Sequence, residues 1–424
     1  MNNHLALKCR LVAMNFLEFA VWGAYLTSMG TLLVNIGLAE QIGWFYAVQG
    51  LVSIFMPGLV GMVADRWIPA QRLLGFCHLA AGAFMCAAAV YGTTHASAVA
   101  MGPLLALYTL SVAFYMPTLA LSNSVAFTAL TRAGLDTVKA FPPIRVFGTV
   151  GFLCTMNAID YAGMQGNFGQ FFVSGALSLV LGLYSQTLPD CPTDKGPRKG
   201  GLAEALCFDA FKLFKVRHMA VFFIFAMLLG VSLQITNAFA NPYITSFRQI
   251  PEFAQTYGAL HANTLISISQ ASETCCILLI PFCLSRFGIK RVMMIAMAAW
   301  GLRFGLFGAG DPGVGVWMFV LSCLVYGVAF DFFNISGALY VDRNTDVKIR
   351  SSAQGLFMIM TNGLGATIGT LSAQQVVNRF VFNAPQVAQL DGWRTSWYIF
   401  AAYALVVLLF FTLIFREGGK EQKA

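Results

Sequence analysis

Residues 316–338 read VWMFVLSCLVYGVAFDFFNISGA, an apolar run with one charged side chain, Asp331. At about 1.5 Å of rise per residue, a helix of this length crosses the roughly 30 Å hydrocarbon core of a bilayer. The whole chain has a similar character, because 58% of its residues are hydrophobic and only 10% are charged. Soluble domains have roughly 45–50% and 25%. Lipid must therefore act as the solvent for much of this chain, and its long continuous runs favour helices over the short alternating strands of a barrel.

Apolar runs of bilayer length predict an all-α membrane protein with twelve transmembrane helices. The first run lacks a small-residue cleavage site, so we expect it to be retained as a helix. The expected helices are 11–36, 42–64, 73–92, 101–127, 146–163, 169–188, 219–243, 262–284, 292–309, 316–338, 353–375 and 396–415.

The positions of the basic residues predict the orientation of the chain. With twelve spans, all 26 Lys and Arg residues lie on the side of the N-terminus except Arg248, Arg303, Arg379 and Arg394, which lie on the other side or at its boundary. Loops rich in Lys and Arg face the cytoplasm. We therefore expect a multi-pass protein of the bacterial inner membrane with both termini cytoplasmic. The net charge of +8 then reflects membrane orientation and gives no reason to expect a nucleic-acid partner.

The chain reads as two related halves. Residues 189–201, PDCPTDKGPRKGG, open a polar linker expected at 189–218, between six-helix halves at 1–188 and 219–424. Val112–Tyr115 in the first half parallels Val328–Asp331 in the second. Such a duplication predicts a six-plus-six architecture, with a ligand site at the midplane between halves that rock to give alternating access.

Charged residues at the loop ends of the second and eighth runs form candidate gates. Gly61 to Arg72 resembles the loop signature of the major facilitator superfamily, G-x-x-x-D-R followed by a basic residue, which implies the major facilitator fold. Arg286 lies at the corresponding place in the second half. We expect a gating role for Asp65, Arg66, Arg72 and Arg286. The alternative is that these charges only set the orientation of the chain in the membrane, because exposed ion pairs contribute little to stability.

Three carboxylates fall inside apolar runs, where a charge costs on the order of 2.5–3.5 kcal/mol on insertion scales. They are Glu18, Glu273 and Asp331, whereas Asp160 is expected at the outer boundary. A carboxyl group in apolar surroundings can take up and release protons near neutral pH. All three are proton-coupling candidates, and Asp331 is favoured because Tyr115 stands at the matching place in the first half.

Amides and aromatic rings accompany two of these carboxylates. Gln234 with Asn237, and Gln270 with Glu273, each share a helical face at i, i+3 spacing. Such groups suit an uncharged ligand with several hydroxyls, although amides can also bond neighbouring helices. Tyr326 and Phe330, four residues apart, could stack on a planar ring or simply pack.

Residues 141–152, FPPIRVFGTVGF, are expected to open the fifth helix, with the prolines at its start and Gly148 and Gly151 in close helix packing. Arg145 could be a further positive-inside residue and Thr149 could bond its own backbone, because periodicity does not fix their depth. The alternative is that both face a ligand.

No set of residues predicts covalent chemistry. The ten cysteines contain no CxxC pair, and the histidines His4, His78, His95, His218 and His261 are expected to sit singly at ends or loops. We therefore expect no enzyme activity, no metal and no cofactor.

Several long blocks resemble the bacterial nucleoside:proton symporter family of the major facilitator superfamily. They are FPPIRVFGTVGF, MLLGVSLQITNAF, SISQASE, RFGIK, VYGVAFDFFNISG and IRSSAQGLFMIMTNG, and the similarity runs from the first helix to the last. The resemblance implies proton-driven import of purine and pyrimidine nucleosides such as uridine and adenosine, by a protein that functions as a monomer in the bilayer. It implies substrate contacts at Arg145, Thr149, Phe152, Gln234, Asn237, Gln270, Glu273, Tyr326, Phe330 and Asp331.

Two departures from the best-known members concern the first helix, where Glu18 replaces a glutamine and Tyr25 a tryptophan. They leave the range of nucleosides open. A proton-coupled sugar or oligosaccharide transporter of the same fold is the alternative, because ribose and other sugars need similar polar partners.

Overall fold

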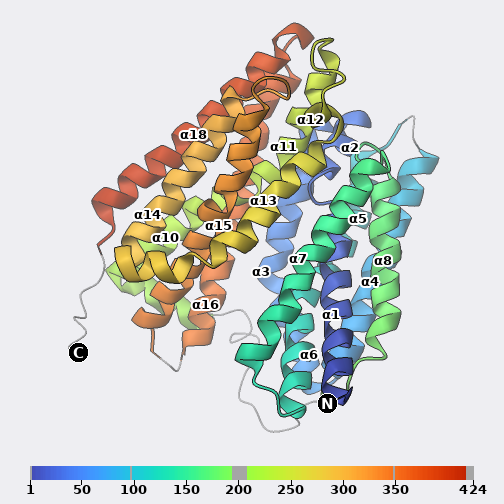
Figure 1. The fold of residues 1–424 in the computed structure, drawn as a ribbon, viewed down its shortest axis with the longest axis vertical. Coiled ribbons are helices and arrows are strands. Elements are labelled where there is room, and N and C mark those ends of the chain that lie inside the picture. Colours follow the sequence, from blue (N-terminus) through green and yellow to red (C-terminus); the bar gives the residue numbers. More distant parts are fainter. Residues whose placement is uncertain (1, 96–97, 193–207, 347–348, 417–424) are drawn as a thin grey trace. The chain divides into compact units, whose positions relative to one another are not determined.

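The computed structural model describes residues 2–95, 98–192, 208–346 and 349–416, which fold into helices, turns and loops (Figure 1). The chain divides into two compact units. Unit 1 contains residues 1–199 with 237–245 and 260–267, and unit 2 contains residues 200–236, 246–259 and 268–424. Each unit is described by itself.

Unit 1 is built around long helices that pack lengthwise. Helix α1 packs along α7, and α4 packs along α8 (Figure 1). Its helices from the first half are α1 (Asn2–Gly23), α2 (Met29–Asn35), η1 (Ala39–Gln41), α3 (Ile42–Arg66), α4 (Ala70–Thr94), α5 (Met101–Tyr115), α6 (Thr118–Arg132), α7 (Thr137–Tyr161) and α8 (Gly169–Ser185).

Unit 2 is organised around α14, which packs against both α15 and α18 (Figure 1). Two helices, α11 (Ile235–Ser246) and α13 (Ala262–Ile277), carry segments of both units. The other elements are η2 (Phe208–Lys215), α10 (Arg217–Leu233), η3 (Phe247–Gln249), α12 (Tyr257–Leu260), α14 (Ile280–Ala309), α15 (Val316–Asn344), α16 (Arg350–Met358), η5 (Ile359–Gly365), α17 (Ala366–Val377), η6 (Asn378–Phe382), η7 (Gln386–Ala388) and α18 (Gln389–Ile414).

The all-α class is confirmed for the described residues, and each expected run is largely helical. Several runs are interrupted, because turns at 24–28, 116–117 and 234 divide single expected helices into α1 and α2, α5 and α6, and α10 and α11. The fifth helix begins at Thr137, so the expected start at residue 146 was wrong, and Pro142 and Pro143 lie inside the helix.

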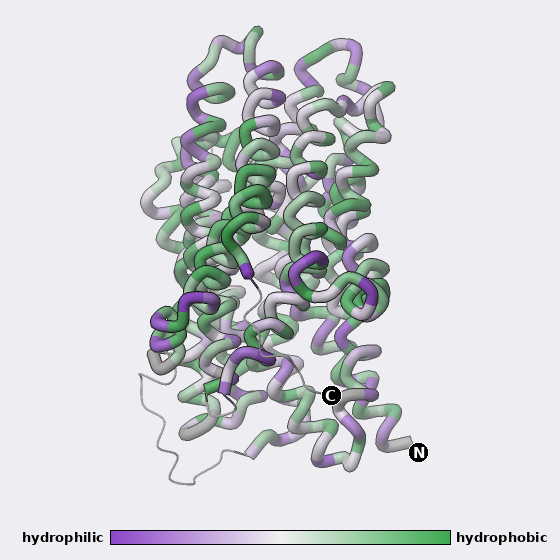
Figure 2. The backbone as a smooth tube through the Cα atoms, turned by 90° about the vertical axis from the view of Figure 1, so that its left-hand side faces the viewer, coloured by the Kyte–Doolittle hydropathy of each residue, from purple (hydrophilic) through white to green (hydrophobic). Residues whose placement is uncertain are grey.

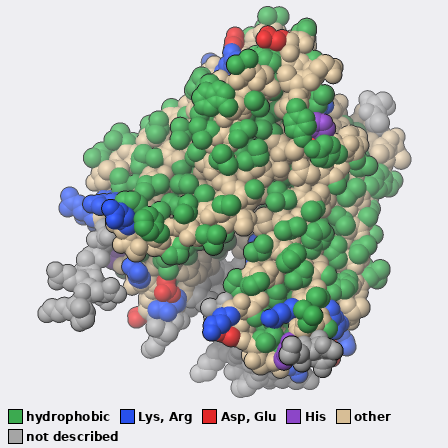
Figure 3. Space-filling view, viewed as in Figure 1, with side chains coloured by type: hydrophobic (Ala, Val, Ile, Leu, Met, Phe, Trp, Pro, Cys, Tyr) green, Lys and Arg blue, Asp and Glu red, His purple; other side chains and the backbone are tan. Residues whose placement is uncertain are grey.

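The distribution of hydropathy fits a membrane protein. Among the described residues, eight helices are long and apolar enough to cross a bilayer. Hydrophobic residues dominate the middle of the long helices, while hydrophilic residues gather toward their ends (Figure 2). Hydrophobic side chains cover much of the visible sides of each unit, and in unit 1 Lys and Arg gather near the N-terminus (Figure 3).

The division expected from sequence, with halves at 1–188 and 219–424 around a linker at 189–218, stays a prediction. Most of that linker, residues 193–207, lies outside the described residues. Residues 237–245 and 260–267, which follow the linker in sequence, belong to unit 1. Parts of the seventh and eighth expected helices therefore pack with the first six.

Candidate functional site

Helix α7 carries the three first-half residues expected at the site. Arg145, Thr149 and Phe152 are spaced by four and three residues, so they share one helical face. The helix approaches α1 closely because Gly151 has no side chain: a Cβ there would lie 2.1 Å from the carbonyl oxygen of Phe16. The close packing expected at Gly151 is confirmed.

The close approach gives Arg145 and Phe152 aromatic neighbours. The guanidinium carbon of Arg145 lies 3.9 Å from the ring centroid of Phe19. Phe152 meets Trp22 edge-on, with ring centroids 6.4 Å apart. Arg145 is half-buried two turns inside the helix and is therefore more than a loop charge for orientation.

Glu18 lies on α1 inside unit 1 and is fully paired there. Its Oε2 is 2.9 Å from Nε2 of His78, and its Oε1 accepts a hydrogen bond from Thr118 at 2.6 Å. Glu18 and His78 are both 0% exposed. The expectation that the histidines sit singly at ends or loops was wrong for His78, which lies well inside α4. The only sequence signal was the position of His78 inside the expected helix 73–92, which did not identify its partner 60 residues away.

The proton count of this pair follows from the hydrogen bonds around it. The Ser178 hydroxyl donates to the carbonyl oxygen of His78 at 2.9 Å. Its oxygen therefore accepts from Nδ1–H of His78, 3.0 Å away. One further proton must lie between Nε2 and Oε2, held as imidazolium with carboxylate or as neutral imidazole with carboxylic acid. In either form the pair has no net charge.

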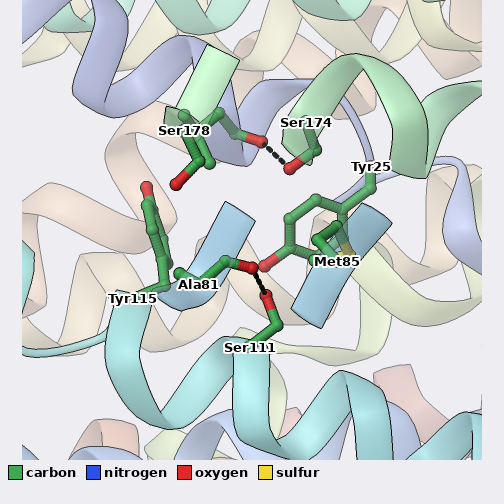
Figure 4. A pocket seen from close by; sticks show the side chains of 8 residues that line it. Tyr25, Ala81, Met85, Ser111, Tyr115, Ser174 and Ser178 are labelled. Carbon is green, nitrogen blue, oxygen red and sulfur yellow. Dashed lines mark hydrogen bonds between the residues drawn. The ribbon is translucent and has the colours of Figure 1, made fainter. Parts of the chain in front are cut away.

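A crevice next to this pair is packed too tightly to bind a nucleoside. Tyr25, Tyr115, Ser111 and Ser174 line it (Figure 4), and it has no room for a water molecule. Ser111 donates to the carbonyl oxygen of Ala81 at 2.8 Å, and Ser174 donates to that of Val21 at 2.8 Å. These serine hydroxyls therefore serve helix packing.

Helices α13 and α15 bring the second-half carboxylates together in unit 2. Gly327 permits the approach, because a Cβ there would lie 2.6 Å from the carbonyl oxygen of Ser272. The Ser272 hydroxyl also bonds to the carbonyl oxygen of Leu324. Glu273, the next residue along α13, then interacts electrostatically with both Asp331 and Tyr326. Gln270 and Glu273 are half-buried on one face of α13, as their spacing predicted.

Aromatic stacking at Tyr326 is present beside Asp331. The rings of Tyr326 and Phe330 stack with centroids 5.5 Å apart and planes at 16°. Asp331 is only 5% exposed, and its buried Oδ2 has no hydrogen-bond partner among the described residues. This carboxyl group has free hydrogen-bonding capacity, in contrast to Glu18.

The seventh expected helix breaks at one of its two candidate amides. Gln234 follows the end of α10 at Leu233, and Asn237 lies in the first turn of α11. Both side chains are half-buried. Interrupted helices in transporters expose backbone groups to a ligand. The sequence pattern located the amides but did not show the break.

Asp160, expected at the outer boundary, joins α7 to the start of α13 within unit 1. Its Oδ2 accepts hydrogen bonds from the backbone N–H and the hydroxyl of Thr264, each at 2.7 Å. Its Oδ1 lies 3.2 Å from Nδ1 of His261 and also accepts from the Gln165 side chain. His261 is therefore a second histidine that does not sit singly.

Arg303 was counted from sequence among the outer or boundary charges, but it is a buried residue of unit 2. Its side chain on α14 is 1% exposed and donates to the carbonyl oxygen of Ser322 at 2.7 Å. The only sequence signal was its position inside an apolar run, which also fits a boundary charge.

The gating residues are only partly described. The side chains of Asp65 and Arg66 lie outside the described residues, and those of Arg72 and Arg286 are exposed. Their gating role stays a prediction, as does the role of every substrate residue.

Known proteins resemble this chain along its length. A sequence profile described as "Nucleoside H+ symporter" matches residues 5–420. The xanthosine permease of Escherichia coli K12 is 42% identical over 99% of this chain and 98% of its own length. The nucleoside permease NupG of the same organism is 42% identical over 97% of this chain and 96% of its own length.

Solved structures agree with the sequence comparisons on the family and confirm the expected major facilitator fold. The crystal structure of nucleoside transporter NupG matches with a TM-score of 0.88 and 41% identity, covering 97% of this chain and all of that one. A D-xylose–proton symporter, 15% identical over 97% of this chain and 98% of its own, shares the fold at a TM-score of 0.67. The chain belongs to the nucleoside H+ symporter family.

Proposed function

We propose that this protein imports purine and pyrimidine nucleosides together with protons by alternating access. Family membership supports the reaction, and one feature of unit 2 supports it most directly. The stacked rings of Tyr326 and Phe330 lie beside the buried, incompletely bonded carboxyl group of Asp331. This arrangement combines an aromatic surface for a nucleobase with a group that can bind a proton.

Recognition of the sugar falls to α13. The Glu273 carboxylate accepts hydrogen bonds from ribose hydroxyls, and the Gln270 amide both donates and accepts. Gln234, at the break after α10, and Asn237 offer further amides. In unit 1, Arg145, Thr149 and Phe152 present one face of α7, where the guanidinium and the Phe152 ring suit polar and planar parts of the ligand.

The coupled proton is carried by Asp331. A proton carrier must exchange its proton during each cycle, so it needs unsatisfied hydrogen-bonding capacity and a route to water. Glu18 meets neither requirement, because both its oxygens are bonded and it is 0% exposed. Glu273 remains the second candidate, with a role in both ribose binding and the proton affinity of Asp331.

The remaining features follow the expected topology. Both termini are cytoplasmic, Asp65, Arg66, Arg72 and Arg286 close the cytoplasmic side, and the monomer is the functional form in the inner membrane. The protein catalyses transport and no covalent reaction, and it needs no cofactor.

The reaction is tested by reconstituting the purified protein in vesicles and imposing an inward proton gradient. Labelled uridine should accumulate above its external concentration, and a protonophore should abolish that accumulation. Excess adenosine should compete, whereas excess xylose should not. Equal final uridine levels with and without the gradient would make the protein a facilitator and would contradict symport.

Two variants separate binding from coupling. Asp331→Asn keeps the shape of the protonated side chain but cannot titrate, so it should exchange labelled for unlabelled uridine without accumulating it. Glu273→Gln loses a charge-assisted acceptor and should weaken uridine binding by about 10–100-fold. Asp391→Asn is the control, because the Asp391 side chain is 84% exposed and should affect neither process. Full accumulation by Asp331→Asn would remove this residue as the proton carrier.

A further inference from the structure

Arg303 is a cation inside unit 2 that has no role in the transport cycle proposed above. It lies on α14, one of the helices apolar enough to span the membrane, and is 1% exposed. A buried charge in such a helix is costly and usually functional.

The guanidinium bonds two helices and faces two rings. Nη1 donates to the carbonyl oxygen of Ser322 on α15 at 2.7 Å and to the hydroxyl oxygen of Ser269 on α13 at 3.4 Å. The guanidinium carbon is 4.6 Å from the ring centroid of Tyr326 and 5.4 Å from that of Phe307. Nε has no hydrogen-bond partner among the described residues. Much of the guanidinium therefore faces aromatic rings.

The Tyr326 ring is held from several directions. Trp300, one turn before Arg303, meets it edge-on with centroids 6.0 Å apart and planes at 88°. Phe330 stacks against it at 5.5 Å. A cation over an aromatic ring is attracted most strongly where water is excluded, as it is here. A planar guanidinium can stack on the ring and bond Ser322 at once, which a lysine ammonium cannot do equally well. Arg303 therefore limits rotation of the ring that the proposed site offers to a nucleobase.

We propose that Arg303 is a positioning residue for nucleobase recognition. Its guanidinium fixes the Tyr326 ring in the orientation that contacts the base, and it raises nucleoside affinity without touching the nucleoside. This inference rests on the proposed function, specifically on a base contact by Tyr326. Preorganising a binding surface raises affinity because less ordering remains to be done on binding.

A double-mutant cycle tests the inference through the dissociation constant of uridine for the purified full chain. Arg303→Gln keeps a donor for the Ser322 carbonyl but removes the cation, and should weaken binding about tenfold. Arg303→Lys keeps the cation but loses the planar contact with the ring, and should weaken binding about threefold. Tyr326→Leu removes the ring and should weaken binding more than either. In the Tyr326→Leu background, Arg303→Gln should have no further effect, because the arginine acts through the ring.

Three outcomes would overturn the inference. If Arg303→Gln weakens binding tenfold with and without the Tyr326 ring, the effects are additive and Arg303 acts by another route, while the proposed base contact stands. If Arg303→Gln binds uridine as tightly as the wild type, the arginine has no positioning role. If Tyr326→Leu leaves affinity unchanged, the base contact itself is wrong and the inference falls with it.

Folding is monitored separately by thermal unfolding of each variant. If Arg303→Gln cannot be obtained folded, the cycle is run with Arg303→Lys, whose threefold effect should also vanish without the ring. Tyr326→Phe is the matched control: it keeps the aromatic face, so Arg303→Gln should still weaken binding about tenfold in that background.

Discussion

Replacing Glu18 by glutamine, leucine or alanine tests the buried pair with His78 by changing one property at a time. Glutamine has nearly the same shape. Its amide N–H can donate to Nε2 of a neutral His78 that keeps its Nδ1–H bond to Ser178, and its carbonyl oxygen can accept from Thr118. Every partner at 2.6–3.0 Å in the wild type is then retained without charge.

The expected magnitudes follow from those partners. Glu18→Gln exchanges a charge-assisted bond for a neutral one but also avoids burying charge, so the stability change should stay within about 1 kcal/mol. Glu18→Leu leaves Nε2 of His78 without a partner, at about 1–3 kcal/mol. Thr118 is not orphaned, because it also donates to the carbonyl oxygen of Tyr115 at 2.5 Å. Glu18→Ala adds a cavity and should cost about 3–5 kcal/mol.

The assay is thermal unfolding of the purified protein in detergent, together with uridine accumulation in vesicles. For a unit of this size, about 3 kcal/mol corresponds to a fall in apparent Tm of roughly 6–12 °C. Combining Glu18→Leu with His78→Met should cost less than the sum of the single changes, because both polar partners are removed. A glutamine variant as unstable as alanine would refute the hydrogen-bond argument. Exchange without accumulation by Glu18→Gln would instead assign the coupled proton to Glu18.

Three further predictions concern unit 1. Asp160→Asn weakens four hydrogen-bond contacts at the start of α13 and should raise the deuterium exchange rate of residues 262–267 about tenfold or more. The exposed control Asp391→Asn should not change that rate, and unchanged exchange in Asp160→Asn would show that Asp160 does not hold this turn. Gly151→Ala places a Cβ 2.1 Å from the Phe16 carbonyl oxygen and should lower the free energy of unfolding by about 1–3 kcal/mol. Gly305→Ala, whose Cβ would have no atom within 4 Å, should be neutral or slightly stabilising in the same unfolding assay, and equal effects of the two variants would contradict the packing argument. Arg145→Lys keeps the positive charge but loses planar stacking on Phe19, so membrane insertion should be normal and uridine affinity should fall about 5–10-fold. Wild-type uridine affinity in a binding assay would mean that the charge alone suffices.

The helices, the membrane and the family could be predicted from the sequence for a physical reason. In lipid, a spanning segment must satisfy its own backbone hydrogen bonds, so the length and apolarity of a run such as 316–338 largely determine its structure. Side chains three or four residues apart share a helical face whatever the tertiary fold, which is why the spacing of Tyr326 and Phe330 placed both rings on one face. The two rings stack on each other, and their contact with a planar ligand ring stays a prediction. The ordered blocks identified the family because they extend along nearly the whole chain.

Contacts between helices depended on the tertiary structure, because they join residues far apart in the chain. His78 gave no sign in sequence of pairing with Glu18, and Asp160 gave none of bonding Thr264, 104 residues away. Arg303 had the pattern of a boundary charge until the fold placed it 4.6 Å from the Tyr326 ring. Local composition fixes which segments enter the membrane, whereas the choice of buried partner depends on which helix faces pack together. That choice decides which charges are structural and which remain available for transport.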